Sequence, residues 1–211
     1  MLPTREDFYS TLEKRHGKKL QKKLSEVSVA VCGLGGLGSN IAVCLARMGV
    51  GRLHLIDFDE VELSNINRQQ YFLSQTGQPK TSAIKEIINL INPFCMLVIH
   101  NTKLCRENYA ELLKDDDIIC EAFDRAESKA ELVDFVTENF PGKYIVASSG
   151  MSGCHTANII KTRKISEKLY ICGDFENSIE KDGTLFASRV MVCAAHQANA
   201  VVEILKGETN E

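Results

Sequence analysis

Strand-like and helix-like segments alternate along the first 150 residues of the chain. Short apolar runs are typical of buried strands, and the longer stretches between them carry apolar residues at helical spacing. The pattern predicts strands over residues 27–31, 52–56, 96–99, 117–122 and 144–147, and helices over residues 4–24, 36–48, 79–92, 107–113 and 128–140. This alternation predicts an α/β fold, with a Rossmann-like, mostly parallel sheet and helices on both of its faces.

The pattern changes after Gly150. Here we expect short antiparallel strands over residues 155–172, a mobile flap over residues 173–183 and a C-terminal helix over residues 186–206. Gly207 follows this last helix, and glycine is a natural residue to end a helix.

The composition is that of an ordinary globular protein, with 211 residues, 44% hydrophobic and 25% charged. This length fits one domain over residues 1–211, in which residues 1–25 form an N-terminal helical arm. The net charge of −3 provides no general basic field, so nucleic acid is not favoured as a partner. No apolar run reaches the roughly 18 residues of a membrane span, and the N-terminus lacks the features of a signal peptide. We therefore expect a cytoplasmic protein that does not enter a membrane.

Eight cysteines are spread along the chain, and no two are spaced as Cys-x-x-Cys. We therefore expect no four-cysteine zinc site. Several lie in apolar runs, where a free cysteine behaves as a small buried hydrophobic residue. Cys193 and His196 lie three residues apart on one helical face, and core packing is a better interpretation of them than a metal or catalytic pair.

A glycine loop follows the first predicted strand and opens the next helix. Gly33, Gly35 and Gly38 satisfy the pattern G-x-G-x-x-G, which lets a backbone approach phosphate closely at a helix N-terminus. Asp57 lies 19 residues after Gly38, at the end of the second strand. A carboxylate at that position accepts hydrogen bonds from ribose hydroxyls, so the sequence predicts a nucleotide-binding site.

Residues 58–77 form a long polar connection, and connections of this length are more often functional than not. Asn65, Arg68 and Gln69 are too polar for a core, and Lys80 follows Arg68 by twelve residues. An isolated Arg or Lys is usually a solvated surface group. If Arg68 and Lys80 converge after Asp57, which ends the second strand, the two cations would instead stabilise the pentacovalent phosphorus of a triphosphate as pyrophosphate leaves.

Two further charged residues each allow two interpretations. Asp124 follows the strand over residues 117–122, where it could bind Mg²⁺ or cap the next helix, and the sequence favours neither. Arg15 lies in the charged N-terminal arm, where it is either a solvated residue or an arginine finger that reaches the phosphates of another subunit.

These motifs resemble those of the ubiquitin-activating-enzyme superfamily, whose bacterial branch adenylates small sulfur-carrier proteins. The resemblance rests on Gly33-x-Gly35-Gly36-x-Gly38, Asp57-Phe58-Asp59, Ser64-Asn65-x-x-Arg68-Gln69, Gly77-Gln78-Pro79-Lys80 and Asp124. Four features resemble its short thiamine-pathway form, the ThiF type. They are the compact length, Arg15-His16, the run from Tyr170 to Asp174, and Arg189-Val190 with the run from Ala194 to Asn199.

The resemblance implies an adenylyltransferase that uses ATP and Mg²⁺. Its substrate would be the C-terminal glycine carboxylate of a small ubiquitin-like (ThiS-like) sulfur carrier that ends in Gly-Gly, for thiamine thiazole synthesis. The catalytic residues would be Arg68, Lys80 and Asp124, with Arg15 acting across a homodimer and Asp124 binding Mg²⁺. The nucleotide-binding residues would be Gly33, Gly35, Gly36, Gly38, Asp57, Asp59, Ser64, Asn65, Asn67, Arg68, Gln69, Lys80, Asp124 and Arg125.

Other functions remain open at this point. Within the superfamily, the substrate could be a carrier of the molybdopterin type or a tRNA, and the net acidity weighs weakly against tRNA. An NAD-binding dehydrogenase would explain the glycine loop but leaves Arg68, Lys80 and Asp124 without roles. A non-catalytic binding scaffold would be favoured by loss of Arg68 or Lys80, and both are present.

The chain departs from longer members of the superfamily because it lacks their paired Cys-x-x-Cys zinc ligands. It also lacks an obvious cysteine motif for sulfur relay. Cys172 lies beside the predicted flap and could receive sulfur as a thiolate, although a buried or bystander thiol is the favoured interpretation.

Overall fold

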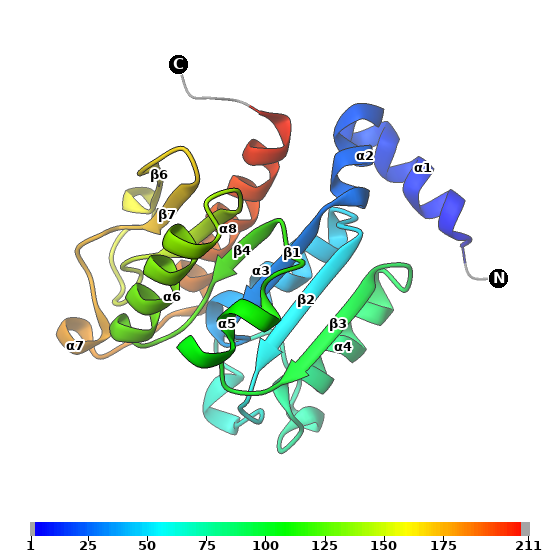
Figure 1. Cartoon of the computed structure of the whole chain (residues 1–211). Helices are drawn as coiled ribbons and strands as arrows, with labels where there is room; N and C mark the ends of the chain where they lie inside the picture. Colours follow the sequence, from blue (N-terminus) through cyan, green and yellow to red (C-terminus); the bar gives the residue numbers. More distant parts are fainter. Residues whose placement is uncertain (1–2, 208–211) are drawn as a thin grey trace.

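Seven strands form one sheet in the order β3-β2-β1-β4-β5-β7-β6, with helices on both faces (Figure 1). This computed structural model describes residues 3–207, apart from the side chains of residues 179 and 180. The strands are β1 (Ser28–Cys32), β2 (Arg52–Asp57), β3 (Met96–Asn101), β4 (Ile118–Glu121), β5 (Tyr144–Ser148), β6 (Lys161–Lys164) and β7 (Leu169–Gly173). The α-helices are α1 (Arg5–His16), α2 (Lys18–Glu26), α3 (Gly36–Arg47), α4 (Lys80–Ile91), α5 (Arg106–Leu112), α6 (Ala126–Asn139), α7 (Ile179–Asp182) and α8 (Ala187–Lys206). The α/β fold predicted from the sequence is confirmed.

Two apolar layers hold the helices against the sheet. Along β1, Val29 and Val31 belong to the core shared with α3, α4 and α8, whereas Ala30 and Cys32 belong to the core shared with α5 and α6. All four side chains are fully buried, which explains why β1 is a continuous apolar run rather than an alternating one. Figure 1 shows α5 and α6 in front of the sheet and α3, α4 and α8 behind it.

The antiparallel strands expected over residues 155–172 are partly confirmed. β6 pairs antiparallel with β7, but β7 itself pairs parallel with β5 and so extends the main sheet. Residues 157–159 form a short 3₁₀ turn instead of a strand. A strand that buries Tyr170 and Cys172 on one face has the same pattern whether its neighbour runs parallel or antiparallel, so sequence alone does not reveal the parallel pairing of β7 with β5.

The helix expected over residues 4–24 is broken into α1 and α2 at Gly17. Its φ of +83° lies in the left-handed region that glycine adopts readily, and its N–H closes α1 by donating to the carbonyl of Glu13 at 2.9 Å. The break brings Gln21 to the carbonyl of Gly49, at 3.3 Å, and to His16 Nδ1, at 2.6 Å. Helical spacing alone does not reveal such a break, because apolar residues keep the same period on both sides of it.

The first two and last four residues of the predicted domain lie outside the described part of the chain. Within residues 3–207, none of the helices combines the length and apolar character needed to cross a bilayer.

The glycine loop depends on close backbone packing. Gly33 has a φ of +92°, and a Cβ there would lie 2.8 Å from the carbonyl oxygen of Ala122, so the loop packs against the end of β4. A Cβ on Gly38 would lie 1.8 Å from the carbonyl oxygen of Gly33. The loop can therefore fold back on the start of α3 only because Gly38 has no side chain.

We expect Gly38→Ala to lower the free energy of unfolding by at least about 3 kcal/mol, because its methyl group collides with backbone that cannot move away. Gly142→Ala is the matched control, since a Cβ on Gly142 meets nothing within 4 Å, and it should change stability by less than about 0.5 kcal/mol. Urea unfolding followed by circular dichroism measures both values. Equal stability of the two variants would contradict the packing described for the loop.

Candidate active site

The carboxylate of Asp57 joins the glycine loop to the segment that follows β2. Its Oδ2 accepts the N–H of Leu34 at 2.5 Å, and its Oδ1 accepts the N–H of Asp59 at 2.8 Å. Burial raises the pKa of Asp57, while Lys80 and the two N–H donors favour its ionised form. Asp57 thus lies where the sequence predicted it, at the end of β2 beside the loop, as a fixed hydrogen-bond acceptor.

Lys80 is brought to the same end of the sheet by the start of α4. Its Nζ lies 2.7 Å from Oδ2 of Asp59, and its N–H donates to the carbonyl of Asp59 at 2.9 Å. The Lys80 side chain is only 7% exposed, whereas that of Asp59 is 48% exposed. A buried ammonium group with a single carboxylate partner retains donors for an additional anionic ligand.

The segment between Asp59 and Lys80 places polar groups around the start of α3. Arg68 Nη1 donates to Asn67 Oδ1 at 2.8 Å and to the carbonyl of Ser64 at 3.1 Å. A Cβ on Gly36 would lie 3.5 Å from Arg68 Cγ, so the stem of Arg68 lies over the first residue of α3. Arg68 and the glycine loop therefore share one surface, as the sequence predicted.

Asn65 and Gln69 are buried, although their polarity predicted that they would lie outside the core. Asn65 Oδ1 accepts the N–H of Glu62 at 3.1 Å, which holds the 3₁₀ turn Leu63–Asn65. Gln69 Oε1 is buried and has no hydrogen-bond partner within the described residues. Its side chain lies near Gly35, because a Cβ there would be 3.9 Å from Gln69 Nε2. An unpaired buried acceptor beside the loop is consistent with a ligand that donates to it.

Asp124 lies at the end of β4, next to the residues that contact the glycine loop. The fully buried Glu121 fixes this end, since its Oε1 accepts the N–H of Phe123 at 2.6 Å and the Lys129 Nζ at 3.0 Å. Asp124 is exposed, and its carboxylate makes no hydrogen bond or ion pair within residues 3–207. The helix-cap interpretation is wrong, because Arg125 occupies the N-cap of α6.

A carboxylate with this exposure and without a partner fits Mg²⁺, which typically takes one or two protein carboxylates and completes its shell with phosphate and water oxygens. Arg125, also predicted to line the site, is exposed and lies 3.9 Å from Glu127.

Arg15 lies at the opposite end of the sheet from these residues. It is exposed on α1, and α1 and α2 precede β1, whereas the glycine loop follows β1 (Figure 1). The Arg15 side chain therefore cannot reach the glycine loop of its own chain.

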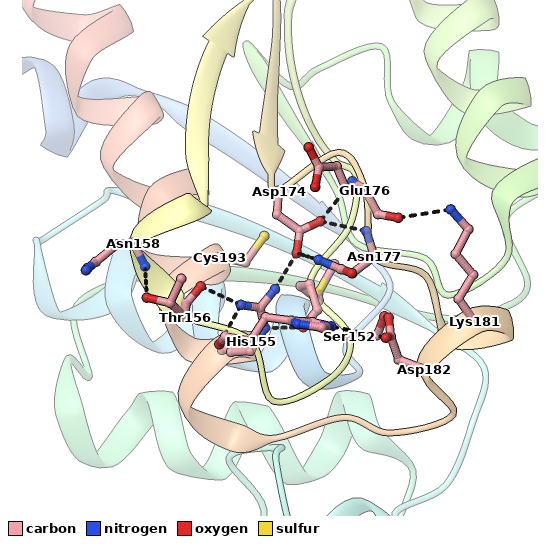
Figure 2. Close-up of polar contacts among 12 residues, drawn as sticks. Ser152, His155, Thr156, Asn158, Asp174, Glu176, Asn177, Lys181, Asp182 and Cys193 are labelled. Atoms are coloured by element: carbon pink, nitrogen blue, oxygen red, sulfur yellow. Dashed lines mark hydrogen bonds and ion pairs between the residues drawn. The ribbon is translucent and has the colours of Figure 1, made fainter.

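A buried ion pair, which the sequence alone did not predict, joins Arg189 to Asp174. Arg189 Nη2 pairs with Asp174 Oδ2, and the guanidinium group also donates to the carbonyls of Met151, His155 and Thr156 at 3.2, 2.8 and 2.8 Å (Figure 2). The side chains of Arg189 and Asp174 are 3% and 0% exposed. In the sequence, the only indications of this pair were an acidic residue just after a strand, Asp174, and an arginine in the first turn of a helix, Arg189. Their contact in the structure shows that they form an ion pair.

The segment expected as a flap begins at this ion pair. Asp174 Oδ1 accepts the N–H groups of Glu176 and Asn177 at 3.0 and 2.9 Å, and one turn of helix, α7, follows. Beyond it, residues 183–188 and Asn67 line a hollow of about 610 Å³. Asn67 Nδ2 donates to the carbonyl of Leu185 at 3.4 Å, so the segment adjoins the polar residues around α3. The mobility of residues 173–183 stays a prediction.

Cys172 lies in the core and not at the surface of the flap. It is fully buried, and burial raises the pKa of its thiol to about 11. Cys193 is also buried and donates to the carbonyl of Cys172 at 3.5 Å, whereas His196 Nδ1 lies 3.0 Å from Thr162 Oγ1. Cys193 and His196 therefore have separate partners, as expected for core packing.

The sequence model of the ThiF family matches residues 9–211, nearly the whole chain. The chain belongs to the ThiF family. It is 36% identical to the tRNA threonylcarbamoyladenosine dehydratase of Haemophilus influenzae over 136 residues, which are 64% of this chain and 51% of that protein. It is 31% identical to the sulfur carrier protein adenylyltransferase of Thermus thermophilus over 131 residues, 62% of this chain and 43% of that protein. The match thus spans about half of these curated relatives.

Among solved structures, the chain is similar to Escherichia coli tRNA N6-threonylcarbamoyladenosine dehydratase in complex with ATP. The TM-score is 0.86 with 20% sequence identity, and the match covers 98% of both chains. At this identity the likeness supports the fold of this ThiF-family chain and not its substrate.

We expect iodoacetamide to modify the exposed Cys154 in the native protein and to leave Cys172 unmodified at about pH 8. The raised pKa and burial of Cys172 keep its thiol protonated and out of reach. Peptide mass spectrometry gives the result, and modification in urea confirms that both sites can be detected. Rapid native modification of Cys172 would restore it as a candidate sulfur acceptor.

Asp174 should contribute to stability in a pH-dependent way. Burial by itself raises its pKa, but hydrogen bonds from Asn177 and Glu176 and the charge of Arg189 outweigh burial, so the pKa lies below its ordinary value. A folded pKa below the unfolded one means that the ionised form stabilises the fold above about pH 4 and that this contribution is lost as the pH falls further.

We therefore expect Asp174→Asn to lower the free energy of unfolding by about 3 kcal/mol at neutral pH, because it leaves Arg189 buried without its counter-ion. The difference from the wild type should narrow below about pH 4. Urea unfolding across this range measures it, and a difference that does not change with pH would contradict the role assigned to the carboxylate.

Proposed function

We propose that the chain is an adenylyltransferase that uses ATP and Mg²⁺ to activate the C-terminal glycine carboxylate of a ubiquitin-like sulfur carrier. The carboxylate oxygen attacks the α-phosphorus of ATP, the bond from that phosphorus to pyrophosphate breaks, and the products are carrier acyl-adenylate and pyrophosphate. The observation that carries the proposal is the packing of Arg68 over Gly36, which places a guanidinium group beside the glycine loop.

Arg68 distinguishes this proposal from a dehydrogenase. Hydride transfer needs no cation at the phosphates, whereas the loss of pyrophosphate develops negative charge that Arg68 and Lys80 can compensate. Membership of the ThiF family supports the same choice.

Several of the predicted residues then have roles in the reaction. The glycine loop and the N-terminus of α3 would hold phosphate, and Asp57 would accept hydrogen bonds from the ribose. Bound Mg²⁺ would neutralise phosphate charge, and Asp124 would hold it. Arg15 would act from a second copy of the chain in a homodimer, since it lies too far from its own site. The protein thus contributes position and charge rather than a covalent step.

The carrier is proposed to be the one that serves thiamine thiazole synthesis. The run from Tyr170 to Asp174, with Arg189-Val190 and the run from Ala194 to Asn199, favours this form, and the relative from Thermus thermophilus is named as a sulfur carrier protein adenylyltransferase. The hollow beside Asn67 offers a place for an extended glycine tail.

A tRNA is the second candidate substrate. It is favoured by the 36% identity with the Haemophilus influenzae protein, which is named for a modified tRNA nucleoside. Both substrates would be activated at a carbonyl or carboxylate group by the same ATP site, so an assay must compare them directly.

ATP–pyrophosphate exchange is the experiment that tests the proposal. We expect exchange that requires Mg²⁺ and a carrier ending in Gly-Gly, and that is absent with a carrier lacking its last glycine. Arg68→Ala should reduce the rate by about 10²-fold, because charge that develops in the transition state loses its partner. Arg106→Ala is the matched control, since Arg106 is exposed on α5 and pairs weakly with Glu138, and it should leave the rate unchanged.

Three outcomes would contradict either the proposed adenylation or the proposed thiamine-type carrier. Activation of tRNA but of no carrier would select the second candidate. Exchange with a molybdopterin-type carrier alone would retain adenylation and exclude the thiamine carrier. Absence of exchange with every substrate, together with tight binding of NAD, would overturn the proposed activity.

A further inference from the structure

The guanidinium group of Arg68 is held by the segment that carries it. It donates to Asn67 Oδ1 at 2.8 Å and to the carbonyl of Ser64 at 3.1 Å. Both partners lie within four residues of Arg68, and Asn67 is exposed, so these bonds set the shape of the segment and not its place against the glycine loop. Arg68 can compensate charge on a phosphate in the loop only if the backbone of its segment is fixed against α3.

Asn40, in the second turn of α3, supplies such an attachment. Its Nδ2 donates to the carbonyl of Arg68 at 3.1 Å and to the carbonyl of Gly36 at 2.6 Å, and its Oδ1 accepts Nε2 of Gln70 at 2.5 Å. The residue is only 5% exposed. One buried amide group thus joins the first residue of α3 to the backbone of Arg68.

Ser39, which precedes Asn40 in α3, makes a second attachment to the same segment. Its hydroxyl donates to the carbonyl of Gly35 at 2.7 Å and accepts the N–H of Gln70 at 3.2 Å. Ser39 is fully buried. Ser39 and Asn40 therefore bind backbone groups on both sides of Gln69, and each of them also binds a carbonyl of the glycine loop.

The formation of α3 does not explain these two polar residues. Serine and asparagine side chains often bond a carbonyl of the preceding turn, and alanine at either position would have a higher helix propensity. The bonds to Arg68 and Gln70, in contrast, join residues that lie 28 to 31 positions apart in the sequence. Residues that depart from local preference in this way are expected at functional sites.

The same bonds determine how the stem of Arg68 crosses the loop. A Cβ on Gly36 would lie 3.5 Å from Cγ and 3.6 Å from Cδ of Arg68. Because one amide group binds the carbonyls of both residues, their backbones cannot separate without breaking a buried hydrogen bond, and an unpaired buried carbonyl is costly.

We propose that Ser39 and Asn40 form a clamp that positions Arg68 over the glycine loop. They are positioning residues, because they hold the backbone of the Arg68 segment and affect the reaction through Arg68. The clamp limits the freedom of the arginine before ATP binds, which lowers the entropic cost of reaching the reactive arrangement. Its effect on catalysis rests on the proposed function, whereas the clamp itself can be tested without a substrate.

Hydrogen–deuterium exchange of the protein alone tests the clamp. We expect Asn40→Ala to speed amide exchange by at least about tenfold in peptides covering residues 66–72, because this segment loses an attachment to α3. Asn92→Ala is the matched control, since Asn92 is fully buried and its Nδ2 donates to the carbonyl of Ala46, at the other end of α3, at 3.3 Å. It should leave the exchange of residues 66–72 as in the wild type.

Two results would overturn the clamp. Wild-type exchange in Asn40→Ala would show that the bonds of Asn40 do not hold the segment. An equal increase in Asn40→Ala and Asn92→Ala would show that any loss from α3 loosens this segment, with no specific role for Asn40.

Kinetics of ATP–pyrophosphate exchange test the effect on Arg68. We expect Asn40→Ala to lower kcat about tenfold and to change the KM for ATP by less than about twofold, because Arg68 compensates charge that develops in the transition state. In an Arg68→Ala background the same substitution should have no further effect, since Asn40 acts through Arg68. A similar loss of kcat in both backgrounds would show a general structural role and overturn the assignment.

A second variant keeps the clamp testable if Asn40→Ala does not fold. Ser39→Ala removes the acceptor of the Gln70 N–H and places a good helix former in α3. We expect it to speed exchange of residues 66–72 by at least about threefold, and wild-type exchange in this variant would overturn the clamp.

The exchange and kinetic results separate the clamp from the proposed function. If the wild type activates no carrier, the proposed function fails, while hydrogen–deuterium exchange still decides whether the clamp holds the segment. If the wild type activates a carrier but Asn40→Ala shows wild-type hydrogen–deuterium exchange, the clamp fails alone.

Discussion

The candidate site depends on the carboxylate of Asp57, which fixes two segments that the chain brings together from either side of β2. One oxygen holds the glycine loop through Leu34 and the other holds the next segment through Asp59. Each oxygen has a second lone pair, so ribose hydroxyls could be accepted without breaking either bond. The site is therefore arranged before a nucleotide binds, and the cost of ordering it is met by folding.

The surrounding packing makes this arrangement possible. Gly38 permits the loop to fold against the start of α3, and Glu121 fixes the end of β4 against which the loop rests. Asp59 then orients Lys80, and the stem of Arg68 covers Gly36. Contacts with neighbouring residues therefore fix the positions of Lys80 and Arg68, which would otherwise be flexible side chains.

Local patterns were sufficient to predict the sheet, the glycine loop and Asp57, because apolar runs and glycine spacing are direct consequences of burial and backbone geometry. They were insufficient where the outcome depended on a distant contact. Gly17 breaks a helix that periodicity continues, and β7 pairs with β5 although β6 lies between them in the chain. Arg189 meets Asp174 through the packing of the C-terminal helix, which local sequence does not show. The burial of Gln69 was missed for a related reason, since its environment is formed by the loop and not by its neighbours in sequence.

The strand order also affects how readily copies of the protein aggregate through the edges of their sheets in concentrated solution. The outer strands are β6 and β3. β6 carries Lys161, Arg163 and Lys164, and such a concentration of positive charge discourages the addition of a foreign strand. β3 begins at Met96, which is 61% exposed, and has no comparable charge. Strand addition is the first step of edge-to-edge aggregation. Positive charge therefore disfavours it at the β6 edge of the sheet, whereas no comparable charge disfavours it at the β3 edge.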